Sequence, residues 1–175
     1  NATAMGISTT AQGSGAVAMG NQTLAKSYSS LAIGRFNDDF GVTSALWNAT
    51  DPLFMIGNGT SAAAPNNAFV VLKNGNTGIG INNPRIKLQI GGGTDASLAD
   101  NSGFLMIGDV NGGNIVFDGN EIIARNNGAN STLFLQNSGG ALETGGAAAK
   151  PGGGSWTATS DARLKQNVLP YKDGL

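Results

Sequence analysis

The side chains that most often carry out chemistry in proteins are scarce in this chain of 175 residues. It contains no His and no Cys, so it lacks the commonest acid–base group, the commonest metal ligand and every thiolate nucleophile. The 11 Asp and Glu residues are scattered, and no two of them are spaced as a catalytic acid–base pair. We therefore expect no enzyme activity in this segment and no cofactor.

Two further patterns have an oxygen-rich or glycine-rich look but do not fit a known site. Asp109, Asn111, Asn114 and Asp118 lie close in sequence, yet they do not have the spacing of a calcium-binding loop. Gly78-Ile79-Gly80 lacks the strand–turn–helix context of a phosphate-binding loop. We expect neither a metal nor a phosphate at these positions.

The composition describes a neutral scaffold rich in turn-forming residues. Gly numbers 28 and Asn 20, charged residues make up 12%, and the net charge is −1. A neutral chain has no electrostatic footprint for nucleic acid or anionic lipid, and no apolar run reaches the roughly 18–20 residues that cross a bilayer. Hydrophobic residues still reach 40% and recur periodically, which argues against disorder. We expect Trp47 and Trp156 to pack at interfaces.

The first 37 residues repeat with a period of fourteen. The blocks 1–14, 15–28 and 29–37 read NATAMGISTTAQGS, GAVAMGNQTLAKSY and SSLAIGRFN. Aligned columns hold Ala4, Ala18 and Ala32; then Met5, Met19 and Ile33; then Gly6, Gly20 and Gly34. Alternation indicates strands, and Ala in one column indicates a face with no room for larger side chains. Each block is therefore interpreted as one coil of a narrow β-solenoid with two short strands, which needs neighbouring coils for stability.

The text AVAMGNQTLAKSYSSLAIG resembles the head repeats of YadA-type trimeric autotransporter adhesins. The resemblance covers residues 1–37. It implies a left-handed parallel β-roll in which three chains pack side by side.

Residues 38–93 break this period and read as a connector of short strands and turns. Apolar runs at 54–56, 69–72, 78–81 and 86–90 alternate with turn signals at 57–59, 74–76 and 82–84, and Asn-Gly between apolar runs is a strong hairpin signal. The segment resembles strand-and-turn linkers of large bacterial surface and tail-fibre proteins.

Residues 94–144 continue in the same style, with strands expected at 104–107, 114–117, 121–124 and 132–136. The text FDGNEIIARNNGANSTLFLQNSGG is similar to a recurring segment of phage tail fibres. We expect a second strand-rich module here.

Strands of four or five residues do not hold together alone, and the pattern offers no helix to cover a sheet. We therefore predict an all-β, elongated homotrimeric fibre, in which a β-roll is followed by short-stranded intertwined β modules and the isolated monomer does not fold. The alternative is a monomeric β-sandwich. The side chains expected in the trimer core are Met5, Met19, Ile33, Phe54, Ile56, Val70, Leu72, Ile79, Ile81, Leu88, Ile90, Leu105, Ile107, Ile115, Phe117, Ile122, Leu133 and Leu135.

A Gly-rich linker, 145–159, leads to a short C-terminal segment, 160–175. The string SDARLKQN at 160–167 resembles the opening of the endosialidase-type intramolecular chaperone domain, which assembles three chains and in many members then cuts itself off. The resemblance implies Ser160 as nucleophile and Lys165 as base at the Thr159–Ser160 bond. So few residues cannot bury the lysine, as the chemistry requires, so we expect this stub to be inactive.

These observations favour an extracellular attachment protein over an enzyme. We expect a homotrimeric fibre that binds a surface receptor, glycan or protein, with no nucleic acid and no membrane insertion. The fibre would belong to a phage-like particle or injection system, or to a bacterial cell surface as an adhesin. A self-cleaving precursor and a polysaccharide-degrading spike are the enzymatic alternatives.

Overall fold

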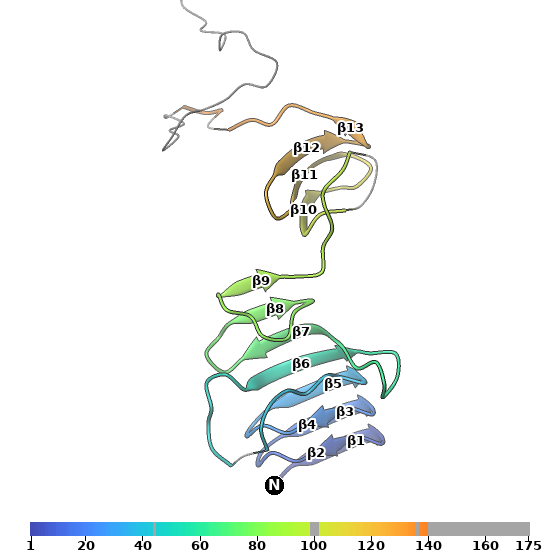
Figure 1. Ribbon diagram of the computed structural model, residues 1–175, viewed down its shortest axis with the longest axis vertical. Helices are drawn as coiled ribbons and strands as arrows, with labels where there is room; N and C mark the ends of the chain where they lie inside the picture. The colour runs from blue at the N-terminus through green and yellow to red at the C-terminus, as the bar shows by residue number, and fades with distance from the viewer. Residues whose placement is uncertain (44, 99–101, 136, 140–175) are drawn as a thin grey trace, which may run out of the picture. The chain divides into compact units, whose positions relative to one another are not determined.

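A computed structural model describes residues 1–43, 45–98, 102–135 and 137–139. The chain divides into two compact units, Asn1–Leu133 and Phe134–Leu175. The described residues form strands without helices, as predicted for an all-β chain (Figure 1). The strands are β1 (Thr3–Ile7), β2 (Thr10–Ala11), β3 (Val17–Asn21), β4 (Leu24–Ala25), β5 (Leu31–Arg35), β6 (Pro52–Asn58), β7 (Asn67–Leu72), β8 (Thr77–Ile79), β9 (Leu88–Ile90), β10 (Leu105–Gly108), β11 (Gly113–Phe117), β12 (Ile122–Asn126) and β13 (Ala129–Asn130).

The N-terminal repeat folds as a β-solenoid, as its period predicts. β1, β3, β5 and β6 stack in parallel, and β2 pairs with β4 in a small second sheet, so each of the first two coils has two strands (Figure 1). The register is that of the sequence alignment: Ala4 faces Ala18, and Ala18 faces Ala32. The fourteen-residue repeat is therefore the length of one coil.

The coil corners need backbone conformations that the repeat supplies at fixed places. Ser8, Gln22 and Phe36, one in each coil, have φ values of 52°, 50° and 43°, in the left-handed region. A corresponding pair at the next corner, Gly15 and Ser29, has φ values of 70° and 52°. Because these positions recur every fourteen residues, each coil turns in the same way and can lie on the last.

Side chains, rather than another strand, close the open edge of β4. The Asn37 side chain accepts from the Leu24 N–H at 2.7 Å and donates to the Leu24 carbonyl at 2.9 Å. An Asp39 carboxylate oxygen accepts from the Lys26 N–H at 2.7 Å. The second sheet therefore ends where Asn37 and Asp39 occupy the place of a third strand.

The large sheet continues beyond the repeat, in the order β1-β3-β5-β6-β7-β8-β9. β6 keeps the parallel register, with Ala32 opposite Met55 and Gly34 opposite Gly57. β7 and β8 are antiparallel, joined by a turn in which Gly75 has φ 82° and its N–H donates to the Leu72 carbonyl at 2.9 Å. This is the hairpin predicted from Asn-Gly, and β9 then pairs parallel to β8.

One predicted turn is wrong. The segment 57–59 was expected to reverse the chain, but β6 runs through Asn58. Gly57 takes the place in β6 that Gly34 has in β5, so it serves the stack of coils. The chain reverses later, between Asn58 and Asn67.

A separate four-stranded antiparallel sheet, in the order β10-β11-β12-β13, follows in residues 105–130. The strands predicted at 104–107, 114–117 and 121–124 are present with shifts of a residue or two. The strand expected at 132–136 is absent from 132–135, because no described strand pairs with these residues. In the described ranges there is no helix with the length and apolar character that a membrane crossing requires.

Candidate self-association surface

The large sheet has two chemically different faces. One face packs against the rest of the chain. Its residues Ala18, Ala32, Met55, Val70 and Leu72 form a small core with Ala16, which precedes β3, and Ala25 of β4. The small Ala residues fit the narrow space between the sheets of the coils. Met55 fills the equivalent place in β6, where its sulfur accepts from Asn37 Nδ2 at 3.8 Å. In the aligned column of Ala4, Ala18 and Ala32, the last two are buried, whereas Ala4 in the first coil is exposed.

The opposite face of the same sheet is apolar along all seven strands. Because strand side chains alternate, the residues that flank the buried positions share this face. We call it the apolar face. The hydrophobic side chains at its outward positions are Met5, Ile7, Val17, Met19, Leu31, Ile33, Phe54, Ile56, Phe69, Val71, Ile79, Leu88 and Ile90.

None of these side chains is buried within the chain. Met5 and Leu88 are 55% exposed, and Met19 and Ile79 are 40% and 41% exposed. Arg35 is the single charged residue at the outward positions of these seven strands. Soluble monomers rarely expose large continuous apolar patches, and such patches mark sites that contact a protein, a membrane or a ligand.

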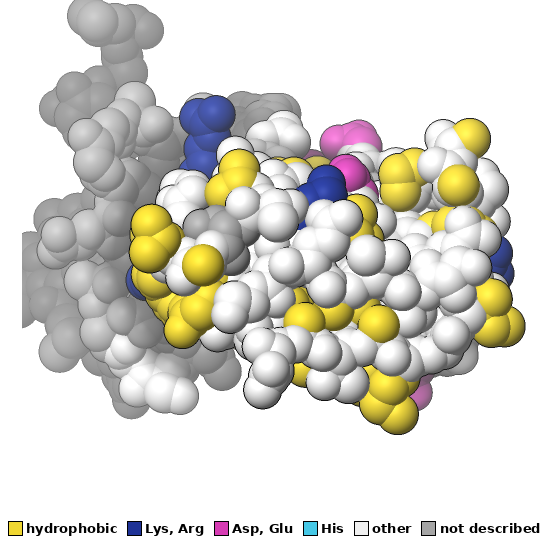
Figure 2. All heavy atoms as spheres, turned by 90° about the horizontal axis from the view of Figure 1, so that it is seen from below, with side chains coloured by type: hydrophobic (Ala, Val, Ile, Leu, Met, Phe, Trp, Pro, Cys, Tyr) yellow, Lys and Arg dark blue, Asp and Glu magenta, His cyan; other side chains and the backbone are white. Residues whose placement is uncertain are grey.

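Seen from the end of the structure at which β1 lies, polar and backbone atoms predominate, with hydrophobic side chains scattered among them and few charged groups (Figure 2). Charge therefore contributes little to the surface at this end of the solenoid.

The trimer-core predictions divide into four groups, one of which lies on the four-stranded sheet. On the apolar face lie Met5, Met19, Ile33, Phe54, Ile56, Ile79, Leu88 and Ile90. Val70 and Leu72 differ from the prediction, since they are 0% and 1% exposed in the core of a single chain. The register explains this: Val70 pairs with Met55, an inward position. Ile81, Leu133 and Leu135 lie outside the strands.

The four-stranded sheet, like the large sheet, has one face with exposed apolar side chains. Its open face carries the remaining predicted residues, Leu105, Ile107, Ile115, Phe117 and Ile122. Leu105, Ile107 and Ile122 are exposed by 43%, 58% and 48%. This second apolar surface is again without cover from the described part of the chain.

The other face of this sheet is held by a buried arginine. Arg125, 2% exposed, donates from Nε to Asn114 Oδ1 at 2.7 Å and from Nη1 to the Ser97 carbonyl. Asn114 also donates to the Asp109 carbonyl at 2.8 Å. Asn114 and Asp109 belong to the oxygen-rich group in the sequence. In the structure the Asn114 side-chain oxygen accepts from Arg125, and the Asp109 carbonyl accepts from Asn114.

Three acidic side chains meet at the edge of the same sheet. Asp95, Asp118 and Glu121 place carboxylate oxygens within 4.8 Å of one another. Backbone N–H groups of Ala96 and Asn120 donate to Asp118 at 3.0 and 2.9 Å, and these hydrogen bonds hold the pKa of Asp118 below its usual value. Sequence spacing missed this group because Asp95 lies far from Asp118 in the chain. The Asp118 oxygens act as turn caps.

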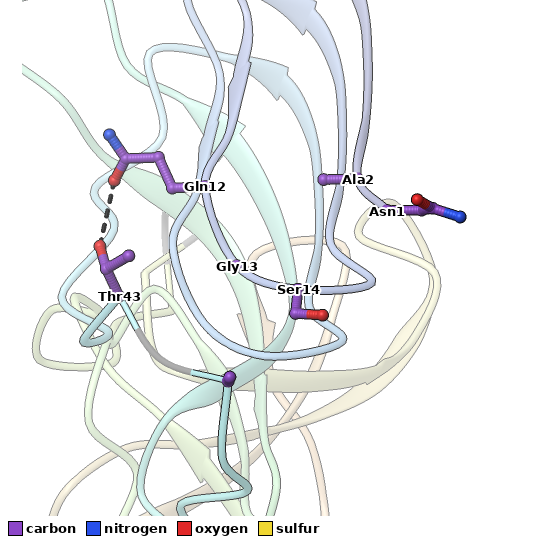
Figure 3. Close-up of a pocket in the computed structure, with 7 residues that line it drawn as sticks. Asn1, Ala2, Gln12, Gly13, Ser14 and Thr43 are labelled. Carbon is purple, nitrogen blue, oxygen red and sulfur yellow. Dashed lines mark hydrogen bonds between the residues drawn. The ribbon is translucent and has the colours of Figure 1, made fainter.

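A shallow polar pocket lies beside the first coil, lined by Asn1, Ala2, Gln12, Gly13, Ser14, Thr43 and Ala45. Gln12 points toward Thr43, whose hydroxyl donates to Gln12 Oε1 at 3.2 Å, while Asn1 points away (Figure 3). The lining side chains carry no acid, base or nucleophile suited to catalysis. The pocket is a groove between the first coil and residues 43 and 45.

The residues implied in self-cleavage, Ser160 and Lys165, lie outside the described residues, as do the linker 145–159 and Trp156. In comparisons with protein-family models, curated proteins and solved structures, no match to this chain was found.

Proposed function

We propose that the chain is a subunit of an elongated homotrimeric fibre that attaches a phage-like particle or an injection system to a surface. In this proposal the solenoid is a left-handed parallel β-roll, and three apolar faces meet along a common axis. The receptor is a glycan or a protein of the target surface, and the fibre is extracellular. A trimeric adhesin of a bacterial cell surface is the alternative reading of the same assembly.

The observation that carries the proposal is the unbroken apolar face of the large sheet. Burial of apolar area stabilises association by about 25 cal/mol per Å2, and a face that extends over seven strands adds this contribution repeatedly. The small Ala-lined interior contributes little, because Ala buries little surface. Self-association by identical faces also explains why one chain presents the same columns in every coil.

The stoichiometry is tested by weighing the native and the denatured protein in solution. We expect the native mass to be three times that of the chain. The single substitutions Met19→Glu and Ile79→Glu place a charge within the apolar face, and both should reduce the native mass toward that of one chain. Val42→Glu, at an exposed apolar residue outside the strands, is the matched control and should leave the trimer intact.

A native mass equal to one chain, in protein that is folded by circular dichroism, would contradict the trimer. The attachment role is tested separately, with fluorescently labelled trimer added to bacterial cells. We expect saturable binding that unlabelled trimer competes away. A folded trimer that labels none of a broad panel of cells would contradict receptor binding by this segment, whatever its stoichiometry.

A further inference from the structure

Two oppositely charged side chains are buried together at one end of the β6–β7 pair. Asp51 immediately precedes β6 and Lys73 immediately follows β7. Lys73 Nζ lies 3.8 Å from Asp51 Oδ2, and the two side chains are 0% and 5% exposed. The Lys73 N–H donates to the Asp51 carbonyl at 3.0 Å. The backbone therefore holds these two residues opposite each other, one residue beyond the last cross-strand pair, Pro52 with Leu72.

Aromatic and polar side chains surround this pair, and one of them, Trp47, is 55% exposed. The ring of Trp47 lies 5.2 Å from Lys73 Nζ, and the ring of Tyr28 lies 5.9 Å from it. Asn48 Nδ2 donates to the other carboxylate oxygen of Asp51 at 3.1 Å, and this bond orients the carboxyl group. Lys73 Nζ and Asp51 Oδ2 have no hydrogen-bond partner.

A buried ion pair in which the amine and one carboxylate oxygen lack hydrogen bonds is an unfavourable end state. Desolvation of the two charges exceeds their mutual attraction unless further hydrogen bonds satisfy both groups. Here the two unsatisfied atoms are the amine nitrogen and one oxygen of the acid. A covalent bond between the two groups would remove both charges and leave a neutral amide in the same buried site.

We propose that Lys73 and Asp51 condense to form an intramolecular isopeptide bond. The lone pair of the neutral Lys73 amine attacks Cγ of the protonated Asp51 carboxyl group, and the Nζ–Cγ bond forms. The Cγ–OH bond then breaks, and the hydroxyl leaves with one Nζ proton as water. The product is an amide with one N–H, and no oxidant, reductant or co-reactant is needed.

The fold supplies the two conditions that this condensation requires. Approach of the reacting groups is fixed by the backbone ladder, which replaces a bimolecular encounter with a positioned contact. Burial of the two side chains, which are 0% and 5% exposed, keeps bulk water from the reacting atoms and protects the amide from hydrolysis. The bond would join the two ends of the segment 51–73, which contains β6 and β7. This pair of strands could then not separate fully under denaturant or load. It does not depend on the proposed trimer.

The test is the intact mass of the purified, folded full chain, measured after denaturation. We expect a mass lower than that of the sequence by one water molecule. Proteolysis and tandem mass spectrometry should yield a branched peptide that joins the segments containing Asp51 and Lys73. Lys73→Arg keeps the positive charge but removes the nucleophilic amine, so it should restore the full mass. Lys87 is an exposed lysine whose Nζ donates to the Asn74 carbonyl. Lys87→Arg should therefore keep the mass loss of one water molecule.

A folded wild-type chain with the full sequence mass would overturn the proposal. So would a water loss that persists in Lys73→Arg, because a succinimide at Asp118-Gly119 also removes one water. If Lys73→Arg does not fold, the wild-type peptide map decides alone: a branched Asp51–Lys73 peptide supports the bond, and separate linear peptides refute it.

Discussion

Asparagine side chains pair with backbone groups at the edges of the solenoid. Asn37 satisfies both the N–H and the carbonyl of Leu24. The Asn67 side chain forms the same pair of bonds with Asp38. It accepts from the Asp38 N–H at 3.2 Å and donates to the Asp38 carbonyl at 2.6 Å. A carboxamide has one acceptor and one donor side, so it can stand in for a peptide group of a missing strand. Some of the many Asn residues in the sequence therefore complete the backbone hydrogen bonding at the edges of the solenoid.

The substitution Asn37→Asp tests this role at a single residue. The carboxylate can still accept from Leu24 N–H but cannot donate to the Leu24 carbonyl, which is then left without its partner in a partly buried site. We expect a loss of about 1–3 kcal/mol of stability, measured by denaturant unfolding at constant chain concentration. Asn83→Asp, at an exposed position, should change stability by much less. Equal effects of the two substitutions would contradict the edge-capping role.

Asp39 makes stability depend on pH. Burial raises its pKa above the ordinary 3.8, against the opposing hydrogen bonds from Lys26 and Gly41. Because the folded state holds this proton more tightly than the unfolded state, the contribution of Asp39 to stability falls as pH rises through the interval above 3.8.

The comparison of wild type with Asp39→Asn isolates this contribution. The free energy of unfolding of the wild type, minus that of Asp39→Asn, should decrease as the pH is raised from below 3.8 toward neutrality and then level off. Each unit by which folding changes the pKa alters the free energy of unfolding by about 1.4 kcal/mol across this pH range. The measurement is a series of denaturant titrations at different pH values. A difference that rises with pH would show that hydrogen bonding, rather than burial, dominates at this carboxyl.

At the scale of the elements, one column of glycines sets how closely the coils stack. Gly6, Gly20, Gly34 and Gly57 lie opposite one another in β1, β3, β5 and β6. Gly20 has φ 128°, and a Cβ atom there would lie 1.9 Å from the carbonyl oxygen of Gly34. The second and third coils can lie this close together at Gly20 because no side chain is present.

Gly20→Ala should therefore prevent the normal stacking of the second and third coils. We expect a loss of several kcal/mol, since backbone strain costs about 1–3 kcal/mol and overpacking costs a similar amount. Circular dichroism with thermal unfolding would measure it. Gly119→Ala is the control, because a Cβ atom there meets nothing within 4 Å. A Gly20→Ala protein as stable as this control would show that the coils can separate without cost.

The repeat predicted the coils well because each column specifies a face, a corner and a register at once. The sequence did not reveal that β6 joins the same stack, since the segment between Arg35 and Pro52 hides the match between Leu31–Gly34 and Phe54–Gly57. Val70 and Leu72 were assigned to the wrong face because alternation defines two faces without saying which one the chain covers. The meeting of Asp51 with Lys73 arises from antiparallel pairing, which local patterns do not fix.

At the scale of the whole molecule, the proposed assembly rests on apolar contact rather than on charge. Among the outward positions of the seven-stranded sheet, Arg35 carries the single charge, and it lies at the end of β5. The four-stranded sheet exposes apolar side chains as well. Association through such surfaces should respond to temperature and salt in the manner of the hydrophobic effect.

This gives a prediction for the trimer that differs from that of a charge-driven complex. Raising the salt concentration from about 0.05 M to about 1 M shortens the screening length severalfold, yet the fraction of assembled chain should not fall, because few charges are screened. Cooling toward 0 °C should weaken association, since hydrophobic stabilisation weakens in the cold. Sedimentation at a fixed, low chain concentration measures both effects. Dissociation by salt would mean that ion pairs hold the chains together, and the apolar face would then need another role.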